Sequence, residues 1–412
     1  MTLADLGHDL ATNWLTYISM PILASAIGYF TKLVAIEMMF KPIEFAGKPP
    51  LLGWQGIIPR NAGRMATIAM DLLLGRLIDP KEILGRMDSD RLVRELREPL
   101  NVAINRIGSD LMTEYYPDIW EMLPNPVQRV VLAQIRAQTP KVVSEIMEDF
   151  RRDMDSYLDV RDMAITNLTT DKAVLNRLVR EVSRPEMRFI ARSGLYFGLG
   201  IGVLQAITWA LTHQPLIMPI FGALVGLSTD WIALKMIFYP REPRSFCGVR
   251  WQGMFQKRRK EVAADYGKLI AEDVLTVSKI MEALLTGPKS DRLLTMVQRN
   301  VGDVLDRQVG LAKPWVVLTV GSDRFRKLKR DVAARAVEAA AETMKPAMDY
   351  ATDALAVERT IVDAMLELTP LEFEKVLRPA FQQDEWKLIL VGGILGGIVG
   401  ELQVHLVLAL TS

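Results

Sequence analysis

The stretch Gly28-Tyr-Phe-Thr-Lys-Leu-Val-Ala-Ile-Glu-Met-Met-Phe-Lys-Pro42 recurs 198 positions later as Gly226-Leu-Ser-Thr-Asp-Trp-Ile-Ala-Leu-Lys-Met-Ile-Phe-Tyr-Pro240. Other matches keep nearly the same offset: Trp54-Gln55-Gly56 returns as Trp251-Gln252-Gly253, and Gly194, Gly198 and Gly202 return as Gly392, Gly396 and Gly400. Self-similarity at a fixed period is the sequence signature of a repeated structural unit. The sequence therefore predicts a tandem duplication, with a first repeat at 1–211 and a second at 212–412.

Four apolar segments indicate crossings of a membrane, at 14–40, 189–211, 216–238 and 386–410. Each has about the 20 residues that an α-helix needs to cross a hydrocarbon layer of ~30 Å. Buried helices of a soluble protein are the alternative, but the runs are long and occupy matching places in both repeats. We expect an all-α polytopic membrane protein with four transmembrane helices and long helical cytoplasmic domains at 60–188 and 255–385.

The distribution of cations predicts the topology. Residues 1–13, 212–215 and 411–412 contain no Lys or Arg, whereas the flanks on the other side carry many, among them Lys41, Lys48, Arg60, Arg241 and Lys257. Loops rich in Lys and Arg stay on the cytoplasmic side. We expect a bacterial inner (plasma) membrane protein with both termini outside and both large domains in the cytoplasm.

Composition argues against several classes of function. The net charge is +1, so no electrostatic signature points to nucleic acid. One cysteine, Cys247, and three histidines leave no multi-cysteine metal site and few candidate general bases. No Walker loop, dinucleotide fingerprint, H-E-x-x-H motif or nucleophile elbow occurs. We expect no catalytic residue, no metal and no cofactor, and therefore not an enzyme.

The pattern G-x-x-T-[N/K/D]-x-x-A-I/L-x-M-x-F-x-P, the following Q-G stretch and the closing glycine-rich helix resemble domain-of-unknown-function family 445, the YheB/YjiN-like bacterial membrane proteins. The resemblance covers nearly the whole chain. It implies a membrane protein with helical cytoplasmic domains and no assigned reaction. Lys32 and Asp230 stand where the family pattern has asparagine, so a role of that asparagine does not carry over.

Charged residues in the first and third apolar segments change sign between the repeats. Lys32 matches Asp230, and Glu37 matches Lys235. Ala24 and Gly28 share a helical face with Lys32, as Gly222 and Gly226 do with Asp230, and small residues at this spacing allow helices to approach closely. We expect the two helices to pack through these faces and to pair Lys32 with Asp230; the alternative is that Lys32 reaches the headgroups. Glu37 and Lys235 are expected to lie at the interface and to reach into it.

The second and fourth apolar segments carry glycines every fourth residue, which predicts tight helix packing. The fourth segment adds Glu401 and His405, one turn apart on one face. A proton relay is conceivable for this pair, but the first repeat has Val203 and Ile207 at those positions. We expect a role in packing or at the outer interface.

The inner-face loops contain Trp54, Gln55 and Gly56 in the first repeat and Trp251, Gln252 and Gly253 in the second, with turn residues and cations around them. This combination is typical of an amphipathic elbow in the headgroup layer. A plain linker between the transmembrane helix and the soluble domain is the alternative.

Heptad-like spacing predicts one seam of large residues in the first cytoplasmic domain. It runs through Val143, Met147, Phe150, Met154 and Tyr157, and the second domain has Ala340, Met344, Ala347, Ala351 and Ala354 in the same frame. Large residues against small ones would let the repeats pack on each other. Pro346 should break the second helix, so we favour seams that pack within their own repeat.

These features predict a non-catalytic membrane scaffold that presents helical cytoplasmic domains to a protein partner or to lipid. Two alternatives stay open. The first is a transporter or channel that uses the Lys32–Asp230 pair, and the second is a lipid-handling protein with an apolar groove between its cytoplasmic helices. The lipid bilayer is the one partner that the sequence predicts directly. The sequence does not predict the oligomeric state.

Overall fold

The protein is almost entirely α-helical, with two short antiparallel hairpins, in a computed structural model that describes residues 14–48, 52–212, 214–246, 249–309, 322–378 and 385–411. The expectations for residues 1–13, His213, Cys247 and the last residue lie outside the described part of the chain. The chain forms two compact units, and each draws on both halves of the sequence. Unit 1 comprises Met1–Leu73, Leu168–Leu269 and Ile361–Ser412, and unit 2 comprises Leu74–Asn167 and Ile270–Thr360.

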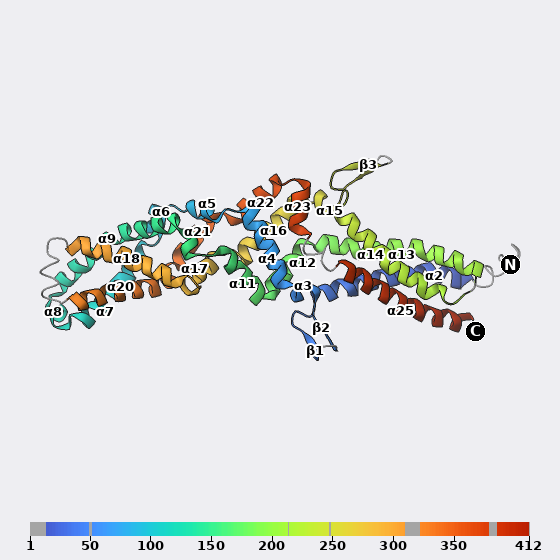
Figure 1. Ribbon diagram of the computed structural model, residues 1–412, viewed down its shortest axis with the longest axis horizontal. Coiled ribbons are helices and arrows are strands. Elements are labelled where there is room, and N and C mark those ends of the chain that lie inside the picture. The colour runs from blue at the N-terminus through green and yellow to red at the C-terminus, as the bar shows by residue number, and fades with distance from the viewer. Residues whose placement is uncertain are drawn as a thin grey trace. The chain divides into compact units, whose positions relative to one another are not determined.

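Unit 1 contains four long helices, several short ones and both hairpins (Figure 1). Its elements are α2 (Trp14–Phe40), β1 (Ala46–Lys48), β2 (Leu52–Trp54), α3 (Ile57–Arg60), α4 (Ala62–Leu72), α12 (Lys172–Val182), α13 (Arg184–Thr212), α14 (Ile217–Phe238), β3 (Arg244–Phe246), β4 (Val249–Trp251), α15 (Met254–Lys257), α23 (Pro370–Leu377) and α25 (Glu385–Thr411). Four elements span a boundary between the units in sequence: η1 (Leu73–Leu77), α11 (Val160–Thr170), α16 (Arg259–Asp273) and α22 (Val357–Glu367).

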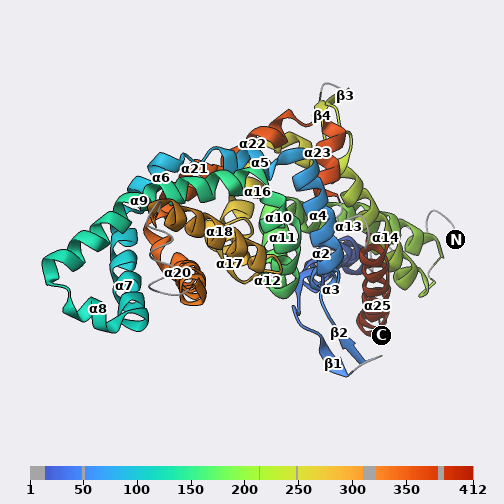
Figure 2. The ribbon, with the colours of Figure 1, turned by 60° about the vertical axis from the view of Figure 1, so that its left-hand side comes forward.

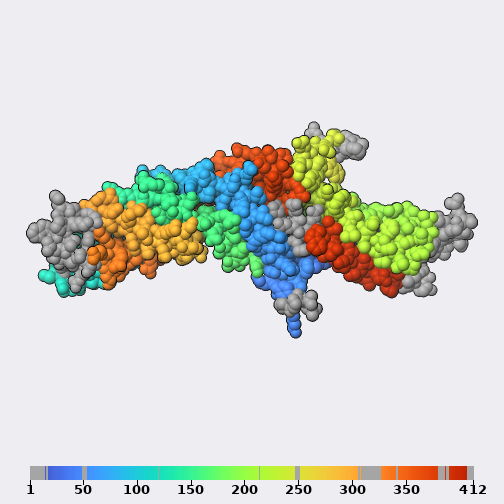
Figure 3. Space-filling view, in the orientation of Figure 1, coloured from blue at the N-terminus to red at the C-terminus, as the bar shows by residue number. Residues whose placement is uncertain are grey.

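In the part of the chain that the structure describes, three helices of unit 1 are long and apolar enough to cross a membrane: Tyr17–Phe40 of α2, α13 and α14. In α25 a shorter apolar stretch, Ile389–His405, stands out among the described residues. The four helices lie side by side, with α2 packed mainly on α13 and α14 mainly on α25 (Figure 1). Figure 3 shows the red surface of α25 lying directly against the green surface of its neighbours. This bundle contains the apolar helices that the sequence predicts.

The two halves of unit 1 share their local contacts. After α2 and after α14 the chain forms a hairpin, where Ala46 pairs with Trp54 and Arg244 pairs with Trp251. Asp171 caps the N-terminus of α12, and Thr369, 198 positions later, caps α23 in a capping box. Such side chains satisfy amide groups that have no partner within the helix. The hairpins differ from the sequence expectation, which gave loops at these two places.

Unit 2 is built from helices of both halves of the sequence. They are α5 (Pro80–Gly85), α6 (Ser89–Glu95), α7 (Arg97–Tyr115), α8 (Pro117–Met122), α9 (Asn125–Arg152), α10 (Met154–Tyr157), α17 (Val277–Thr286), α18 (Ser290–Val309), α20 (Ser322–Thr343), the 3₁₀ turn η3 (Lys345–Ala347) and α21 (Met348–Leu355). In the turned view α18 lies beside both α17 and α20 (Figure 2).

The seam expected to pack within its own repeat does the opposite. Phe150 and Met154 are buried in one cluster with Leu284, Met296 and Ala333 of the second half. Bulky residues of the first half therefore fill space that small and medium residues of the second half leave, which explains why both halves form one core. Pro346 breaks the second seam as predicted, because α20 ends at Thr343 and η3 follows. The side chain of Ala340 lies outside the described residues.

Candidate functional site

The four-helix bundle of unit 1 encloses an ion pair between Lys32 on α2 and Asp230 on α14. The Lys32 Nζ lies 3.1 Å from the Asp230 Oδ1. Lys32 is 2% exposed and Asp230 is 6% exposed. The Lys32 ammonium also donates to the Ser193 hydroxyl of α13 at 3.3 Å, and that hydroxyl donates to the carbonyl of Ile190. Each charge is therefore neutralised inside the bundle, and the alternative in which Lys32 reaches the headgroups does not describe this geometry.

Pairing has a clear energetic reason. An isolated charge in the centre of a membrane helix costs about 2.5–3.5 kcal/mol on insertion scales. Removing one member of a buried pair leaves the other uncompensated, which is more costly than losing the pair as a whole. The sign change between matching positions thus places one cation and one anion where they cancel. The geometry suits a contact that holds α2 and α14 together.

The expected packing of α2 on α14 through their small faces is wrong. A Cβ on Gly28 would overlap the backbone of Gly194, and one on Gly226 would overlap that of Gly392. The small faces therefore face the second and fourth helices, within each half of the sequence. A Cβ on Gly198 would lie 2.6 Å from the carbonyl oxygen of Ala24. Backbones this close tolerate no side chain, which is why glycine stands at these positions.

The other glycines on these faces also lie directly against the backbone of the neighbouring helix. Gly202 lies against α2 at Pro21, Gly222 against Gly396, and Gly400 against Met218 and Pro219. The charged pair meets above these contacts, because the Lys32 side chain passes over Gly194 and the Asp230 carboxylate lies over Gly392. Because Gly194 on α13 and Gly392 on α25 have no side chain, the side chains of Lys32 and Asp230 have room to reach each other.

A second polar contact joins α13 to α25 inside the bundle. The Gln205 Nε2 donates to the Gln403 Oε1 at 3.3 Å, and both residues are at least 95% buried. Among the described residues the Gln403 Nε2 has no hydrogen-bond partner. The two residues are 198 positions apart, like Lys32 and Asp230. The sequence prediction gave these glutamines no role, although their spacing of 198 positions was the signal.

Glu37 and Lys235 lie at the ends of α2 and α14 and differ in their partners. Glu37 pairs with Arg180 at 2.5 Å and with Lys41 at 3.3 Å. Lys235 is exposed, with its Nζ 5.2 Å from the ring centre of Trp231 and 5.7 Å from that of Tyr239. Glu37 is therefore held in ion pairs, whereas Lys235 packs on aromatic rings.

The two inner-face loops form elbows of the same construction. The Gly56 amide donates to the carbonyl of Pro42, and the Gly253 amide to that of Pro240, both at 2.9 Å. The Gln55 side chain donates to the carbonyl of Ile43 at 2.8 Å. In the second elbow Gln252 donates likewise to Arg241 at 3.2 Å, and in the first the Trp54 indole donates to Met38. These contacts fix how the chain leaves each apolar helix.

The Glu401 and His405 pair is loose. The His405 Nε2 lies 4.0 Å from the Glu401 Oε1, and the two side chains are 73% and 58% exposed. Both residues face outward on α25 rather than toward Lys32 and Asp230. The exposed Glu401–His405 pair therefore does not contact the buried charges of Lys32 and Asp230.

Unit 2 contains an apolar cavity of about 780 Å³. Helices α6, α7 and α9 line one side, and α17, α18, α20 and α21 line the other. Its wall is almost wholly aliphatic, and it includes Ile104, Ile107, Val131, Val143, Met147, Phe150, Ile280, Met281, Met296, Val301, Ala336 and Met344. The few polar side chains in the wall are Gln134, Gln138, Thr139 and Thr343. The cavity thus suits an apolar molecule.

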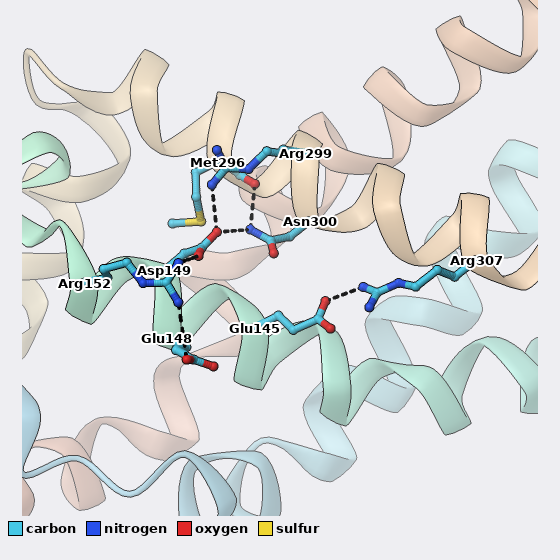
Figure 4. A network of polar contacts seen from close by, with 8 residues as sticks. All are labelled: Glu145, Glu148, Asp149, Arg152, Met296, Arg299, Asn300 and Arg307. Carbon is cyan, nitrogen blue, oxygen red and sulfur yellow. Dashed lines mark hydrogen bonds and ion pairs between the residues drawn. The ribbon is translucent and has the colours of Figure 1, made fainter.

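A polar network fastens α9 to α18 within unit 2 (Figure 4). The Asp149 Oδ2 accepts hydrogen bonds from Asn300 at 3.0 Å and from Arg299 at 2.8 Å. These bonds hold the pKa of the Asp149 carboxyl below its usual range, with the Asn300 contact the larger cause. One end of α18 is held by Arg307, which pairs with Glu145 at 2.6 Å.

The described residues offer no cluster of three or more His, Cys, Asp or Glu side chains that could hold a metal ion. The buried charges of unit 1 among the described residues are paired: Lys32 with Asp230, Glu186 with Arg258, and Glu374 with Arg241 and Arg378. The buried amides of Gln205 and Gln403 hydrogen-bond to each other. The buried space of unit 2 is aliphatic. The cavity of unit 2 can bind an apolar ligand, and the polar contacts of unit 1 hold its helices together.

Comparison with known proteins supports a membrane protein. No family model and no solved structure matches the chain. A UPF0754 membrane protein of Rippkaea orientalis is 21% identical over 425 residues, covering 93% of this chain and 94% of the relative. One of Nostoc punctiforme is 24% identical over 444 residues, covering 97% and 99%. A third, of Microcystis aeruginosa, is 38% identical over 108 residues, or 25% of this chain and 26% of the relative. Over nearly its whole length, the chain is similar to cyanobacterial proteins named as UPF0754 membrane proteins.

Proposed function

We propose that this chain is a non-catalytic, membrane-anchored lipid-handling protein, in which unit 2 holds an acyl chain. The cavity of about 780 Å³ in unit 2 carries the proposal. Its volume lies within the range of about 300–1,000 Å³ that small-molecule pockets occupy. A wall of aliphatic side chains with few hydrogen-bonding groups selects against polar ligands, because it cannot replace the hydrogen bonds that they make in water.

The chemistry of the wall favours a long aliphatic chain. Each methylene that leaves water for an apolar site contributes about 0.8 kcal/mol. A cavity lined by Leu, Ile, Val and Met side chains stays dry when empty and accepts apolar molecules. Methionines such as Met147, Met281 and Met296 adapt their shape to a flexible ligand. A protein that is anchored by apolar helices has such ligands at hand in the surrounding bilayer.

The proposal includes the finer architecture drawn from the sequence. It has four transmembrane helices, α2, α13, α14 and α25, arising from a tandem duplication, in a bacterial inner membrane with both termini outside. Contacts that recur at matching positions support the duplication, among them Gly28 with Gly194 and Gly226 with Gly392. The likeness to domain-of-unknown-function family 445 belongs to this proposal as well.

Displacement of a fluorescent fatty acid from the purified full-length protein tests the proposal. Ala336 on α20 lines the cavity, whereas Ala334 on the same helix is exposed and does not. Ala336→Trp fills the cavity and should weaken binding at least about tenfold, the equivalent of losing roughly two buried methylenes. Ala334→Trp adds the same side chain outside the cavity and should bind like the wild type.

Two results would contradict lipid handling. One is a wild type that binds no fatty acid and carries no lipid through purification. The other is an Ala336→Trp protein that binds as well as Ala334→Trp, which would place the bound probe elsewhere.

A protein partner is the second candidate, and it corresponds to the scaffold interpretation. Large apolar side chains of α7, α8 and α9 are exposed, with Met122 at 82%, Val130 at 67% and Val102 at 67%. Exposed apolar side chains are a feature of surfaces that bind a partner. The two functions separate in the fatty-acid assay, because Met122→Ser and Val102→Ser should leave binding unchanged while releasing a protein partner.

The transporter interpretation depends on Lys32 and Asp230 and predicts a flux in vesicles of purified protein. Lys32→Ala or Asp230→Ala should then abolish that flux. If the Lys32–Asp230 pair only holds α2 and α14 together, wild-type vesicles should show no flux above that of protein-free vesicles.

A further inference from the structure

A groove of about 780 Å³ runs along unit 1 where α14 ends and the second elbow begins. It extends from the last two turns of α14 to the β3–β4 hairpin. The residues that decide its chemistry are Trp231, Lys235, Tyr239, Arg241, Arg244 and Trp251. Because α14 is one of the helices apolar enough to span a membrane, this groove lies at a membrane–water boundary.

The groove changes from apolar to cationic along the helix. Trp231, Ile232 and Met236 line the part on α14, and Trp231 is 52% exposed. The part on the connection and the hairpin carries Arg241 and Arg244. Aromatic residues exposed beside a spanning helix characteristically mark the headgroup level. An apolar wall that leads into a cluster of cations matches the two ends of one lipid.

The cations of the groove are not all occupied by protein carboxylates. Arg241 pairs with the buried Glu374 at 2.5 Å. Arg244 is exposed on β3, and Lys235 has aromatic rings rather than a carboxylate beside it. Among the described residues of the lining, Glu242 is the single acidic one, against three basic ones. The groove therefore carries net positive charge after Arg241 is satisfied.

The first elbow has the same construction but lacks the cations of the groove at the matching positions. At offsets of 198, Leu33 stands for Trp231, Glu37 for Lys235, Ile43 for Arg241 and Ala46 for Arg244. The carboxylate of Glu37 is occupied by Arg180 and Lys41. The fold of an elbow alone therefore does not require the indole of Trp231 or the cations at 235, 241 and 244, since the first elbow does without them although it keeps Trp54 in place of Trp251.

We propose that this groove binds the headgroup of an anionic phospholipid, with the phosphate on Lys235 and Arg244 and an acyl chain along Trp231 and Met236. Basic residues close to a membrane surface attract anionic lipid. Exposed indole rings at this depth position the lipid through their apolar faces. The groove lies in unit 1 and shares no lining residue with the acyl-chain cavity in unit 2, so the two binding sites can be tested independently.

The test uses full-length protein in vesicles that contain brominated phosphatidylglycerol or brominated phosphatidylcholine at equal mole fraction. Bromine quenches the fluorescence of tryptophans that it approaches, and the difference between wild type and Trp231→Phe gives the signal of Trp231, along which the acyl chain is placed. We expect phosphatidylglycerol to quench that signal more strongly. Arg244→Gln and Lys235→Gln should each lower the preference about fivefold, the typical contribution of one basic residue.

Lys48→Gln is the matched control, because Lys48 is an exposed cation on β1 of the first hairpin. It removes the same charge and should retain the preference, as should Ala336→Trp in unit 2. Arg244 is exposed, so the Arg244→Gln protein should keep the wild-type thermal unfolding midpoint. Soluble inorganic phosphate should not reverse the quenching.

Equal quenching by the two lipids in the wild type would overturn the proposal. So would a Lys48→Gln protein that loses as much preference as Arg244→Gln, because the effect would then be general surface charge. Reversal by inorganic phosphate would assign the groove to a soluble anion and not to a lipid.

Discussion

Lys32 and Asp230 stand at equivalent positions of the two halves, 198 residues apart, and their side chains meet at 3.1 Å inside the bundle. One half supplies the cation and the other supplies the anion. A chain whose halves were identical here would bring two like charges together, which is unfavourable. Because of the sign change, α2 of the first half and α14 of the second half attract each other at this level of the bundle.

Neutralising one member of the pair should destabilise the protein. We expect Lys32→Gln or Asp230→Asn each to lose about 3–5 kcal/mol, because the remaining charge stays buried without a partner. The exchange of Lys32→Asp with Asp230→Lys should recover much of the loss. Unfolding of the purified protein in mixed micelles measures both effects.

The exposed pair of Lys41 with Glu37 provides the control for this experiment. Lys41→Gln should cost well under ~1 kcal/mol, as surface pairs do. A double exchange no more stable than either single variant would mean that the two charges do not stabilise each other.

Two glycines of α13 should respond in opposite ways to alanine. A Cβ on Gly198 meets the backbone of Ala24, whereas one on Gly200 meets nothing within 4 Å. Gly198→Ala should lower stability by about 1–3 kcal/mol, the usual cost of overpacking. Gly200→Ala should be neutral or stabilising by up to about 1 kcal/mol, because alanine favours helix. Thermal unfolding of the two variants side by side decides the matter, and an equal loss in both would exclude close packing at Gly198.

Much of unit 1 could be predicted from the sequence. Apolar runs of the right length, glycines every fourth residue and charges of opposite sign at matching positions are local signals that repeat. The choice of packing partner could not be predicted, because small faces occur on all four helices and nothing in their spacing says that Gly28 faces Gly194 and not Gly226. Gln205 and Gln403 were visible as a repeat, but an amide in an apolar run has no single expected role.

Unit 2 was less accessible to sequence reasoning. Its cavity is lined by residues from Leu84 to Leu355, so no local window contains it. Pro346 suggested that the second seam could not form one straight contact, and from this we expected packing within each repeat. The helices on either side of that break still line the same cavity as Phe150 and Met147, because a break redirects a helix without removing its apolar face.

The charge asymmetry predicts which side of the membrane each loop occupies. After Cys247→Ser, a cysteine introduced at Gln214 should react in intact cells with a reagent that does not cross membranes. One introduced at Asp110 should react only after the cells are opened. Both residues are exposed, so lack of labelling cannot be due to burial. Labelling of position 110 in intact cells would reverse the topology.

Asp149 should make the stability of unit 2 depend on pH. Hydrogen bonds from Asn300 and Arg299 hold its pKa below the usual value. A depressed carboxyl pKa contributes stability that is complete above the unfolded-state pKa of about 3.9. That contribution is lost as the pH falls through the lower folded-state pKa. We expect Asp149→Asn to flatten the acid limb of a plot of unfolding midpoint against pH. Asp110→Asn, an exposed carboxylate on α7, is the control and should leave the curve unchanged; identical curves for wild type and Asp149→Asn would show that the contact between α9 and α18 does not depend on this charge.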